Sequence, residues 1–150
     1  MTKNILAFIH NNHTTAILEE IHLPRGTKIK EIKNLKNYSG TSNDIILFGL
    51  TGNSEIRPEE EEQIQDVLKL HNKIHPTFVI ITPFSFEDKV DLSYINQKLD
   101  ILKEAQVDFE ILELQDLVRK YRNYTFTQAF KEIQKVLELI CKVKFNKFKG

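Results

Sequence analysis

Residues 45–81 read IILFGLTGNSEIRPEEEEQIQDVLKLHNKIHPTFVII, and this stretch predicts two buried strands with a helix between them. The continuous apolar runs Ile45–Leu50 and Phe78–Ile81 are typical of central strands that are covered on both faces. Pro58 suits the first position of a helix, because the N–H that proline lacks would be unpaired there anyway. A strand, a helix and a second strand in this order predict a unit of a mostly parallel sheet.

The predicted helix has an acidic start and one largely apolar face. Glu59–Glu62 place four carboxylates in the first turn, where the helix dipole favours negative charge. One face is then formed by Ile64, Val67, Leu68, His71 and Ile74. Pro76 predicts the end of the helix.

The alternation of strands and helices extends to both ends of the chain. Apolar runs predict strands at Ile5–Ile9 and Phe109–Leu114, and the alternating sequence TKIKEIKNL (27–35) predicts a strand with one wetter face. Helices are predicted at Thr14–Ile21, through Tyr94, Ile95, Leu99 and Leu102, and through Phe126, Phe130, Ile133, Leu137 and Ile140. The predicted fold class is therefore α/β, a three-layer Rossmann-like architecture with a mainly parallel central sheet of Rossmann-like or tubulin-like order. Residues 1–143 form one predicted domain, followed by a basic C-terminal tail at 144–150.

Composition narrows the class of protein without naming a ligand. The 150 residues carry 21 Lys+Arg and 21 Asp+Glu, so net charge gives no general argument for nucleic acid or an anionic membrane. The single cysteine, Cys141, excludes an internal disulfide and a cysteine-based zinc site, and its position beside Ile140 predicts a core residue. The apolar run near the N-terminus is too short for a signal peptide or a membrane span, which predicts a cytoplasmic protein.

The segment TPFSFED (82–88) follows the third buried strand and is unusually aromatic for a loop. It resembles a Thr-x-Pro-Phe-x-Phe-Glu segment of FtsZ, the tubulin-like bacterial division protein, with one residue missing. Two further matches follow in the same order: Val107 and Asp108 with Asp116 on a Pro-Asn-Asp-x-Leu motif, and QAFKEIQKVL (128–137) on the start of the central helix. The chain from Phe78 to about Ile140 is thus similar to the nucleotide-binding domain of the FtsZ and tubulin-like GTPase family.

The departures from that family concern the parts that bind and hydrolyse GTP. The turn HNNHTT (10–15) has no glycine, and the turn after the second central strand keeps only Gly49 and Gly52 of a glycine-rich phosphate loop. Four carboxylates at Glu59–Glu62 point at the place where phosphate charge would lie. The family's catalytic loop and second domain are not in this chain. The resemblance therefore implies a degenerate, truncated relative that neither hydrolyses GTP nor polymerises in the usual way.

The resemblance also gives the positions that would hold GTP or GDP if a nucleotide were bound. The guanine-facing Asn of the family corresponds to Gln115 and the Asp of its central helix to Gln134, while its ring-stacking Phe is kept as Phe130. The full candidate set is Asn11, Asn12, Thr14, Thr51, Gly52, Asn53, Gln115, Phe130 and Gln134. The residues of HNNHTT could hold an anion through their side chains at a helix start, although they equally serve as a helix cap without any ligand, and the cap is the more common role.

Other candidate sites have simpler interpretations. His71 and His75 lie four residues apart, a metal-ligand spacing, but polar groups suit a helix C-terminus and no carboxylate or cysteine pattern accompanies them or the pair His10 and His13. The basic and aromatic cluster at 119–124 and the tail KVKFNKFKG (142–150) could contact nucleic acid or an anionic membrane. A lysine-rich chain end is more often a solvated terminus, so nucleic acid is not the favoured partner.

Three functions follow from these observations. The leading hypothesis is a non-catalytic FtsZ-like domain that binds another protein, either FtsZ or a second copy of itself, in cell division or filament control. The first alternative is a regulatory domain that still binds GTP or GDP through altered loops. The second alternative is a sensor of nucleic acid or a cyclic oligonucleotide on a Rossmann-like scaffold.

Overall fold

The computed structural model describes residues 4–9, 12–19, 21–52, 55–82, 92–113 and 126–147. Five strands form one sheet: β1 (Asn4–Ile9), β2 (Thr27–Ile32), β3 (Ile45–Gly49), β4 (Thr77–Thr82) and β5 (Phe109–Glu113). Every neighbouring pair is parallel, and the order across the sheet is β2-β1-β3-β4-β5. The predicted α/β class with a parallel central sheet is therefore confirmed. The order is that of the flavodoxin-like group of doubly wound sheets.

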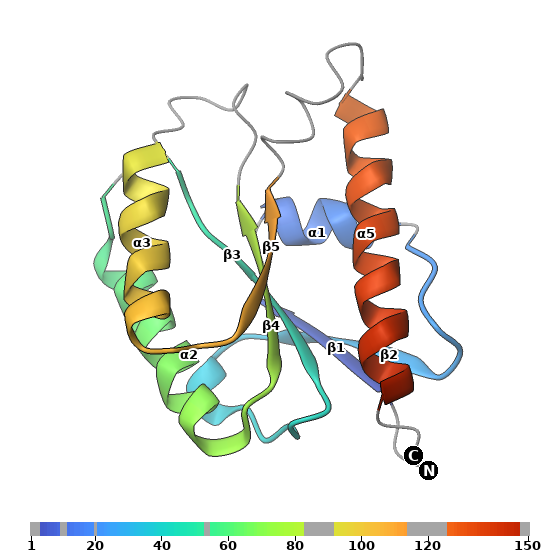
Figure 1. Cartoon of the computed structure of the whole chain (residues 1–150), viewed down its shortest axis with the longest axis horizontal. Coiled ribbons are helices and arrows are strands. Elements are labelled where there is room, and N and C mark those ends of the chain that lie inside the picture. The colour runs from blue at the N-terminus through green and yellow to red at the C-terminus, as the bar shows by residue number, and fades with distance from the viewer. Residues whose placement is uncertain are drawn as a thin grey trace.

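Helices cover both faces of the sheet and make the three layers. They are α1 (Asn12–Leu18), α2 (Pro58–Ile74), α3 (Leu92–Glu104) and α5 (Phe126–Lys147), with a short 3-10 helix η1 (Leu35–Asn37) after β2. Helices α2 and α3 lie on one face, while α1 and α5 lie on the other (Figure 1). Because the chain passes from one side of β1 to the other between β2 and β3, the reversal of strand order falls between β1 and β3.

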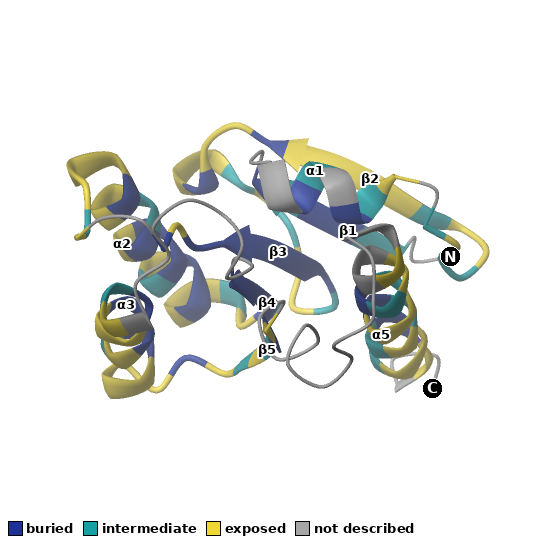
Figure 2. Cartoon of the chain, turned by 90° about the horizontal axis from the view of Figure 1, so that it is seen from above, coloured by how far each residue is buried: buried dark blue, intermediate teal, exposed yellow. Residues whose placement is uncertain are grey.

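Alternation along the strands divides the apolar side chains between two cores. In β3, Ile46 and Phe48 pack under α2 and α3, whereas Ile45 and Leu47 pack under α1 and α5. All four side chains are fully buried, because a central parallel strand is covered from both sides. Figure 2 shows this directly, since the middle of the sheet is coloured as buried throughout.

Strand β2 differs from the prediction for 27–35. The strand ends at Ile32, and Leu35 belongs to η1 rather than to the sheet. Its side chains do not alternate between a wet and a dry face, because four consecutive residues, 28–31, are exposed. The physical reason is position: β2 is the outermost strand and pairs only with β1.

The helix boundaries agree in part with the predictions. The first helix is α1, which begins two residues earlier than predicted and ends at Leu18 instead of Ile21. Helix α2 begins at Pro58 as predicted and ends in a left-handed residue, His75 (φ 48°), whose N–H donates to the His71 carbonyl at 3.2 Å before Pro76. At the C-terminus, α5 continues to Lys147, so the predicted tail boundary at 143/144 falls inside a helix, and Phe145 is buried in the core.

None of the helices in the described part of the chain is both long enough and apolar enough to cross a membrane. The aromatic segment after Thr82 and the basic cluster at 119–124 lie outside the described residues.

Candidate functional site

In an open parallel sheet, ligands bind beyond the carboxyl ends of the strands at the point where the strand order reverses. Here the strand order reverses between β1 and β3, and we call the region beyond the carboxyl ends of these two strands the crevice. Of the predicted site residues, Asn12 and Thr14 follow β1, and Thr51 and Gly52 follow β3. Asn11 and Asn53 belong to the same two turns but lie outside the described residues.

Thr14 is used inside the fold. Its side chain is fully buried, and its hydroxyl donates to the carbonyl of Ile9 at 2.9 Å. This bond ties the first turn of α1 to the last residue of β1. Asn12 is the first residue of the same helix. The local role of Thr14 is therefore to fix the strand-to-helix turn.

A buried ion pair lies at the other side of the crevice, under the turn that follows β3. It joins Lys98 of α3 to Glu60 of α2 through Lys98 Nζ and Glu60 Oε1, and their side chains are 0% and 8% exposed. Lys98 Nζ also donates to the Thr51 carbonyl at 2.6 Å and contacts the Thr51 hydroxyl oxygen at 3.1 Å. The ammonium group thus has three contacts inside the protein, one ion pair with Glu60 and two hydrogen bonds to Thr51.

The second oxygen of Glu60 binds the turn itself. The backbone N–H of Thr51 donates to Glu60 Oε2 at 3.2 Å, and the Thr51 hydroxyl donates to the same oxygen. Loops that bind phosphate do so by directing free backbone N–H groups at the anion, near a cation or a helix N-terminus. In this chain the carboxylate of Glu60 binds to the turn as a phosphate would, and the cation beside it is Lys98.

This cluster was missed by sequence reasoning, which interpreted Glu59–Glu62 only as a helix start. A signal was present in α3, because Lys98 falls between Ile95 and Leu102 on the apolar face of that helix. A lysine on a buried face requires a buried carboxylate as its partner, since an unpaired charge in the core is strongly unfavourable. The sequence does not say which carboxylate, because Glu60 and Lys98 are far apart in the chain.

Of the residues predicted to face a base, Gln134 is the one whose side chain falls within the described part of the chain. Gln134 of α5 donates its side-chain N–H groups to the carbonyls of Ile17, at 2.9 Å, and Glu19. These bonds satisfy carbonyls at the end of α1, which a helix leaves without internal partners. The backbone of Phe130 also lies in α5, and Gln115 is outside the described residues. Thr51 contacts α2 and α3 on one face of the sheet, whereas Gln134 contacts α1 on the other.

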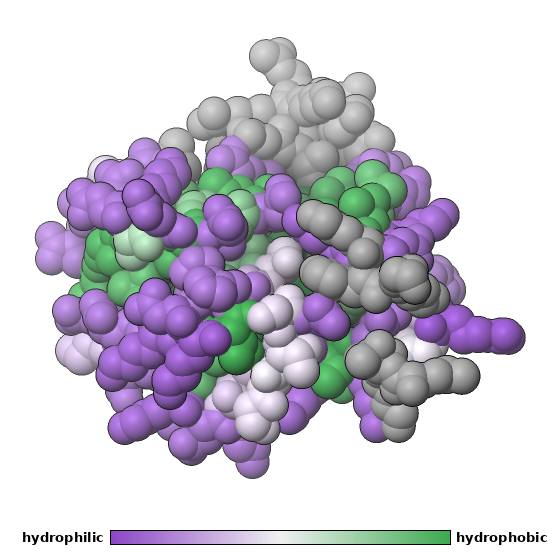
Figure 3. Space-filling model, turned by 60° about the horizontal axis from the view of Figure 1, so that its bottom comes forward, coloured by the Kyte–Doolittle hydropathy of each residue, from purple (hydrophilic) through white to green (hydrophobic). Residues whose placement is uncertain are grey.

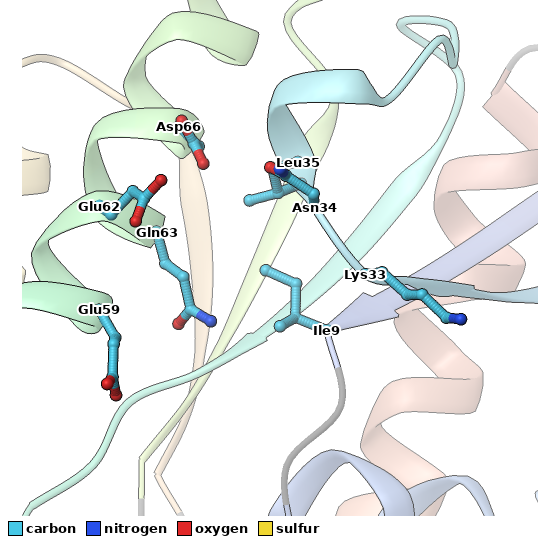
Figure 4. Close-up of a pocket in the computed structure, with 8 residues that line it drawn as sticks. All are labelled: Ile9, Lys33, Asn34, Leu35, Glu59, Glu62, Gln63 and Asp66. Carbon is cyan, nitrogen blue, oxygen red and sulfur yellow. The ribbon is translucent and has the colours of Figure 1, made fainter.

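A polar pocket lies beside the crevice, between α2 and the segment that follows β2 (Figure 4). We call it the acidic pocket; its volume is about 190 Å³, and it is lined by Ile9, Lys33, Asn34, Leu35, Glu59, Glu62, Gln63 and Asp66. Ile9 is the last residue of β1, so the pocket adjoins the reversal of strand order. Sequence reasoning did not find it, because its two walls come from residues about thirty positions apart.

The histidine pair lies at the opposite end of the sheet, the end that Figure 3 brings forward and that is largely hydrophilic. The rings of His71 and His75 meet edge to face with centroids 4.8 Å apart. Burial and the neighbouring charge of His75 lower the pKa of His71, outweighing Asp108, which raises it. Within the described residues no three metal-ligating side chains are grouped closely enough to hold an ion. His71 is a buried residue in the last turn of α2.

Cys141 is also confirmed as a core residue. Its side chain is fully buried in the cluster under α1 and α5, and burial followed by the charge of Glu138 raises the pKa of the thiol to about 12. Burial therefore disfavours the thiolate, which is the reactive form of a cysteine.

No protein-family model matches the sequence, and a search of curated proteins finds no match.

Proposed function

We propose that this chain is a non-catalytic α/β domain, a degenerate relative of the FtsZ and tubulin-like family, that works by binding another protein. The observation that carries the proposal is the occupation of the turn after β3 by Glu60 and Lys98. The backbone N–H of Thr51 and the ammonium of Lys98 are the groups that would otherwise attract a phosphate, and both are bound to the Glu60 carboxylate. Exposed Glu59, Glu61 and Glu62 add further negative charge at the start of α2.

A protein-binding role is supported by the outer face of α5. Three large apolar side chains are exposed there with helical spacing: Val136, Leu139 and Val143. The inner face of the same helix is buried through Ile133, Leu137 and Phe145. The helix thus has apolar residues on two sides, and Leu139 and Val143 are 61% and 58% exposed. A contiguous exposed apolar stripe is typical of a protein contact.

The proposal is tested by two measurements on the whole chain. Calorimetric titration with GTP, GDP and ATP should show no binding in the micromolar range, because the phosphate-attracting groups are occupied. Size-exclusion chromatography with FtsZ from the same cell, and of the chain alone at increasing concentration, should show a complex with FtsZ or with a second copy. Micromolar nucleotide binding would instead support the regulatory nucleotide-binding alternative.

A pair of variants assigns the complex to α5. Leu139→Ser with Val143→Ser should abolish the complex, because it removes the exposed apolar contact without altering the buried face. The control is Lys142→Ser, an exposed residue of the same helix between the two. If the control weakens the complex as much as the double variant does, the apolar stripe is not the contact.

A further inference from the structure

The acidic pocket contains a buried carboxylate that nothing in the described part of the chain neutralises. Asp66 is only 8% exposed, and it makes no hydrogen bond or ion pair with any residue that the structure describes. Figure 4 shows its carboxylate on the pocket wall, facing the gap between α2 and Asn34. Its carboxylate oxygens are not fully enclosed and are reached from the pocket, so a cation that enters the pocket can pair with them.

The other charged side chains of the pocket also favour a bound cation. Glu59, Glu62 and Asp66 recur at intervals of three and four residues and therefore share one side of α2, the side that forms the pocket wall. Lys33 also lines the pocket, but its side chain extends away from the three carboxylates (Figure 4), and no ion pair joins it to them. Three like charges on one wall repel each other, and a cation bound between the walls would relieve the repulsion.

The shape and lining of the pocket select the kind of cation. The carboxylates are spread along two turns of helix, and in the described residues they do not converge as metal ligands do. Gln63 contributes an amide to the same wall, while Ile9 and Leu35 are buried apolar residues at the base and opposite wall. An extended cation with an apolar stem fits this lining, because the stem can contact Ile9 and Leu35 while the charged end meets the carboxylates.

We propose that the acidic pocket receives an arginine side chain from the protein partner. A guanidinium group is planar and carries five N–H donors, so it can meet carboxylates and amides at the same time. This assignment rests on the proposed function, and it adds a charged contact with the partner to the apolar contact at α5, which lies on the other face of the sheet. The pocket adjoins the carboxyl end of β1, the region where folds with this strand order bind ligands.

The probe is the blocked peptide acetyl-Gly-Arg-Gly-amide. Its binding is measured from the chemical-shift changes that it causes in the backbone amides of the whole chain. Shifts should concentrate at residues 33–35 and 59–66. The same peptide with citrulline in place of arginine keeps the shape and loses the charge, and it should bind at least about tenfold more weakly because the charge-assisted hydrogen bonds are lost. The lysine peptide should also bind more weakly than the arginine peptide, because it has no planar fork.

Two isosteric neutralisations provide the variant test. Asp66→Asn combined with Glu62→Gln should weaken the arginine peptide by about tenfold or more. The matched control is Glu61→Gln, an exposed carboxylate of the same helix turn that does not line the pocket and should change affinity by less than about twofold. A folded spectrum for each variant confirms that any loss is one of binding.

Several results would overturn the assignment. The first is the absence of chemical-shift changes at about 10 mM arginine peptide, a concentration at which even millimolar binding is visible. The second is binding of the citrulline or lysine peptide as tight as that of the arginine peptide. The third is a loss of affinity for Glu61→Gln as large as that for the double variant. Failure here is separable from failure of the proposed function. If the chain forms its complex with a partner but does not bind the peptide, only the assignment of the acidic pocket is wrong. If the chain binds a nucleotide at micromolar concentration, the proposed function is wrong, whether or not the peptide binds.

Discussion

Lys98 and Glu60 form an ion pair inside the molecule, and the pair joins α3 to α2 beneath the turn that follows β3. Lys98→Met should lower the free energy of unfolding by about 3–5 kcal/mol, because it leaves the Glu60 carboxylate buried without its cation. Lys103→Met, an exposed position on the same helix, should change it by less than about 0.5 kcal/mol. Urea unfolding measures both. Adding Glu60→Leu to Lys98→Met should recover part of the loss, and a purely additive double variant would show that the two charges do not interact.

Asp66→Asn should leave the chain as stable as before or raise its free energy of unfolding by about 1 kcal/mol, because it removes a buried charge that has no partner in the described structure. Most substitutions of buried residues destabilise, so the sign of the effect is diagnostic. Asp100→Asn on the exposed side of α3 provides the reference. A loss of more than about 1 kcal/mol for Asp66→Asn would show that the carboxylate has a stabilising partner.

Gly40→Ala should destabilise the loop before β3 by about 1–3 kcal/mol through overpacking. A methyl group at this position would overlap with the Asp44 carboxylate and the Tyr38 ring. These two side chains are hydrogen-bonded to each other, and Asp44 also accepts from the Thr41 N–H and hydroxyl, both at 3.0 Å. Thermal unfolding measures the change.

Gly26→Ala is the informative comparison for Gly40. Gly26 has φ +87° and open space around it, so its substitution is unfavourable only through the backbone, by about 1–2 kcal/mol. Gly40→Ala should abolish the Tyr38–Asp44 contact, seen as a change in tyrosine absorbance, whereas Gly26→Ala should leave that signal unchanged.

The stability of the chain should fall as the pH drops below about 6.5, in part through His71. Because the pKa of His71 is lowered in the folded state, the unfolded chain binds the proton more readily. The contribution of neutral His71 to the free energy of unfolding is therefore complete above the ordinary histidine pKa, and it is lost as the pH falls. His71→Gln should flatten the slope of the free energy of unfolding against pH between about pH 7 and pH 5. His22→Gln, at an exposed position, should leave that slope unchanged. Equal slopes for the two variants would show that His71 is not responsible.

Phe145→Ala should cost about 3–5 kcal/mol, because Phe145 is 2% exposed and packs in the core beneath α5. Val143→Ala, at an exposed position two residues earlier, should be nearly neutral. Chemical denaturation distinguishes the two. If both variants had equally small effects on the free energy of unfolding, residues 144–147 would be a solvated tail, as the lysine-rich sequence predicts.

The fold could be predicted because its signal is local. Each central strand is a continuous apolar run, and Ile45–Leu50 can be assigned from its own residues without knowing its neighbours. The errors arose where position in the sheet mattered more than local pattern. Residues 27–35 alternate in sequence, but the outer position of β2 exposes both of its sides. Phe145 was assigned to a tail because the lysines around it hid the helical spacing from Leu137 and Cys141.

The candidate site was harder to predict, because its contacts join residues that are distant in the chain. Gln134 was identified by position in a motif, yet its contacts with α1 depend on how two helices meet. The pairing of Glu60 with Lys98 and the isolation of Asp66 are likewise properties of packing. Composition showed that 21 acidic residues were present, but only the structure shows which of them is neutralised and which is not.

The two outer strands of the sheet bear charges along their exposed edges. Lys28, Lys30 and Glu31 are exposed on β2, and Glu110 and Glu113 are exposed on β5. A strand from another molecule could extend the sheet only by bringing its backbone against these charged side chains, which natural proteins use to prevent such pairing. These charges therefore oppose growth of the sheet from either outer strand, and this leaves the exposed apolar face of α5 as the better surface for a contact with another protein.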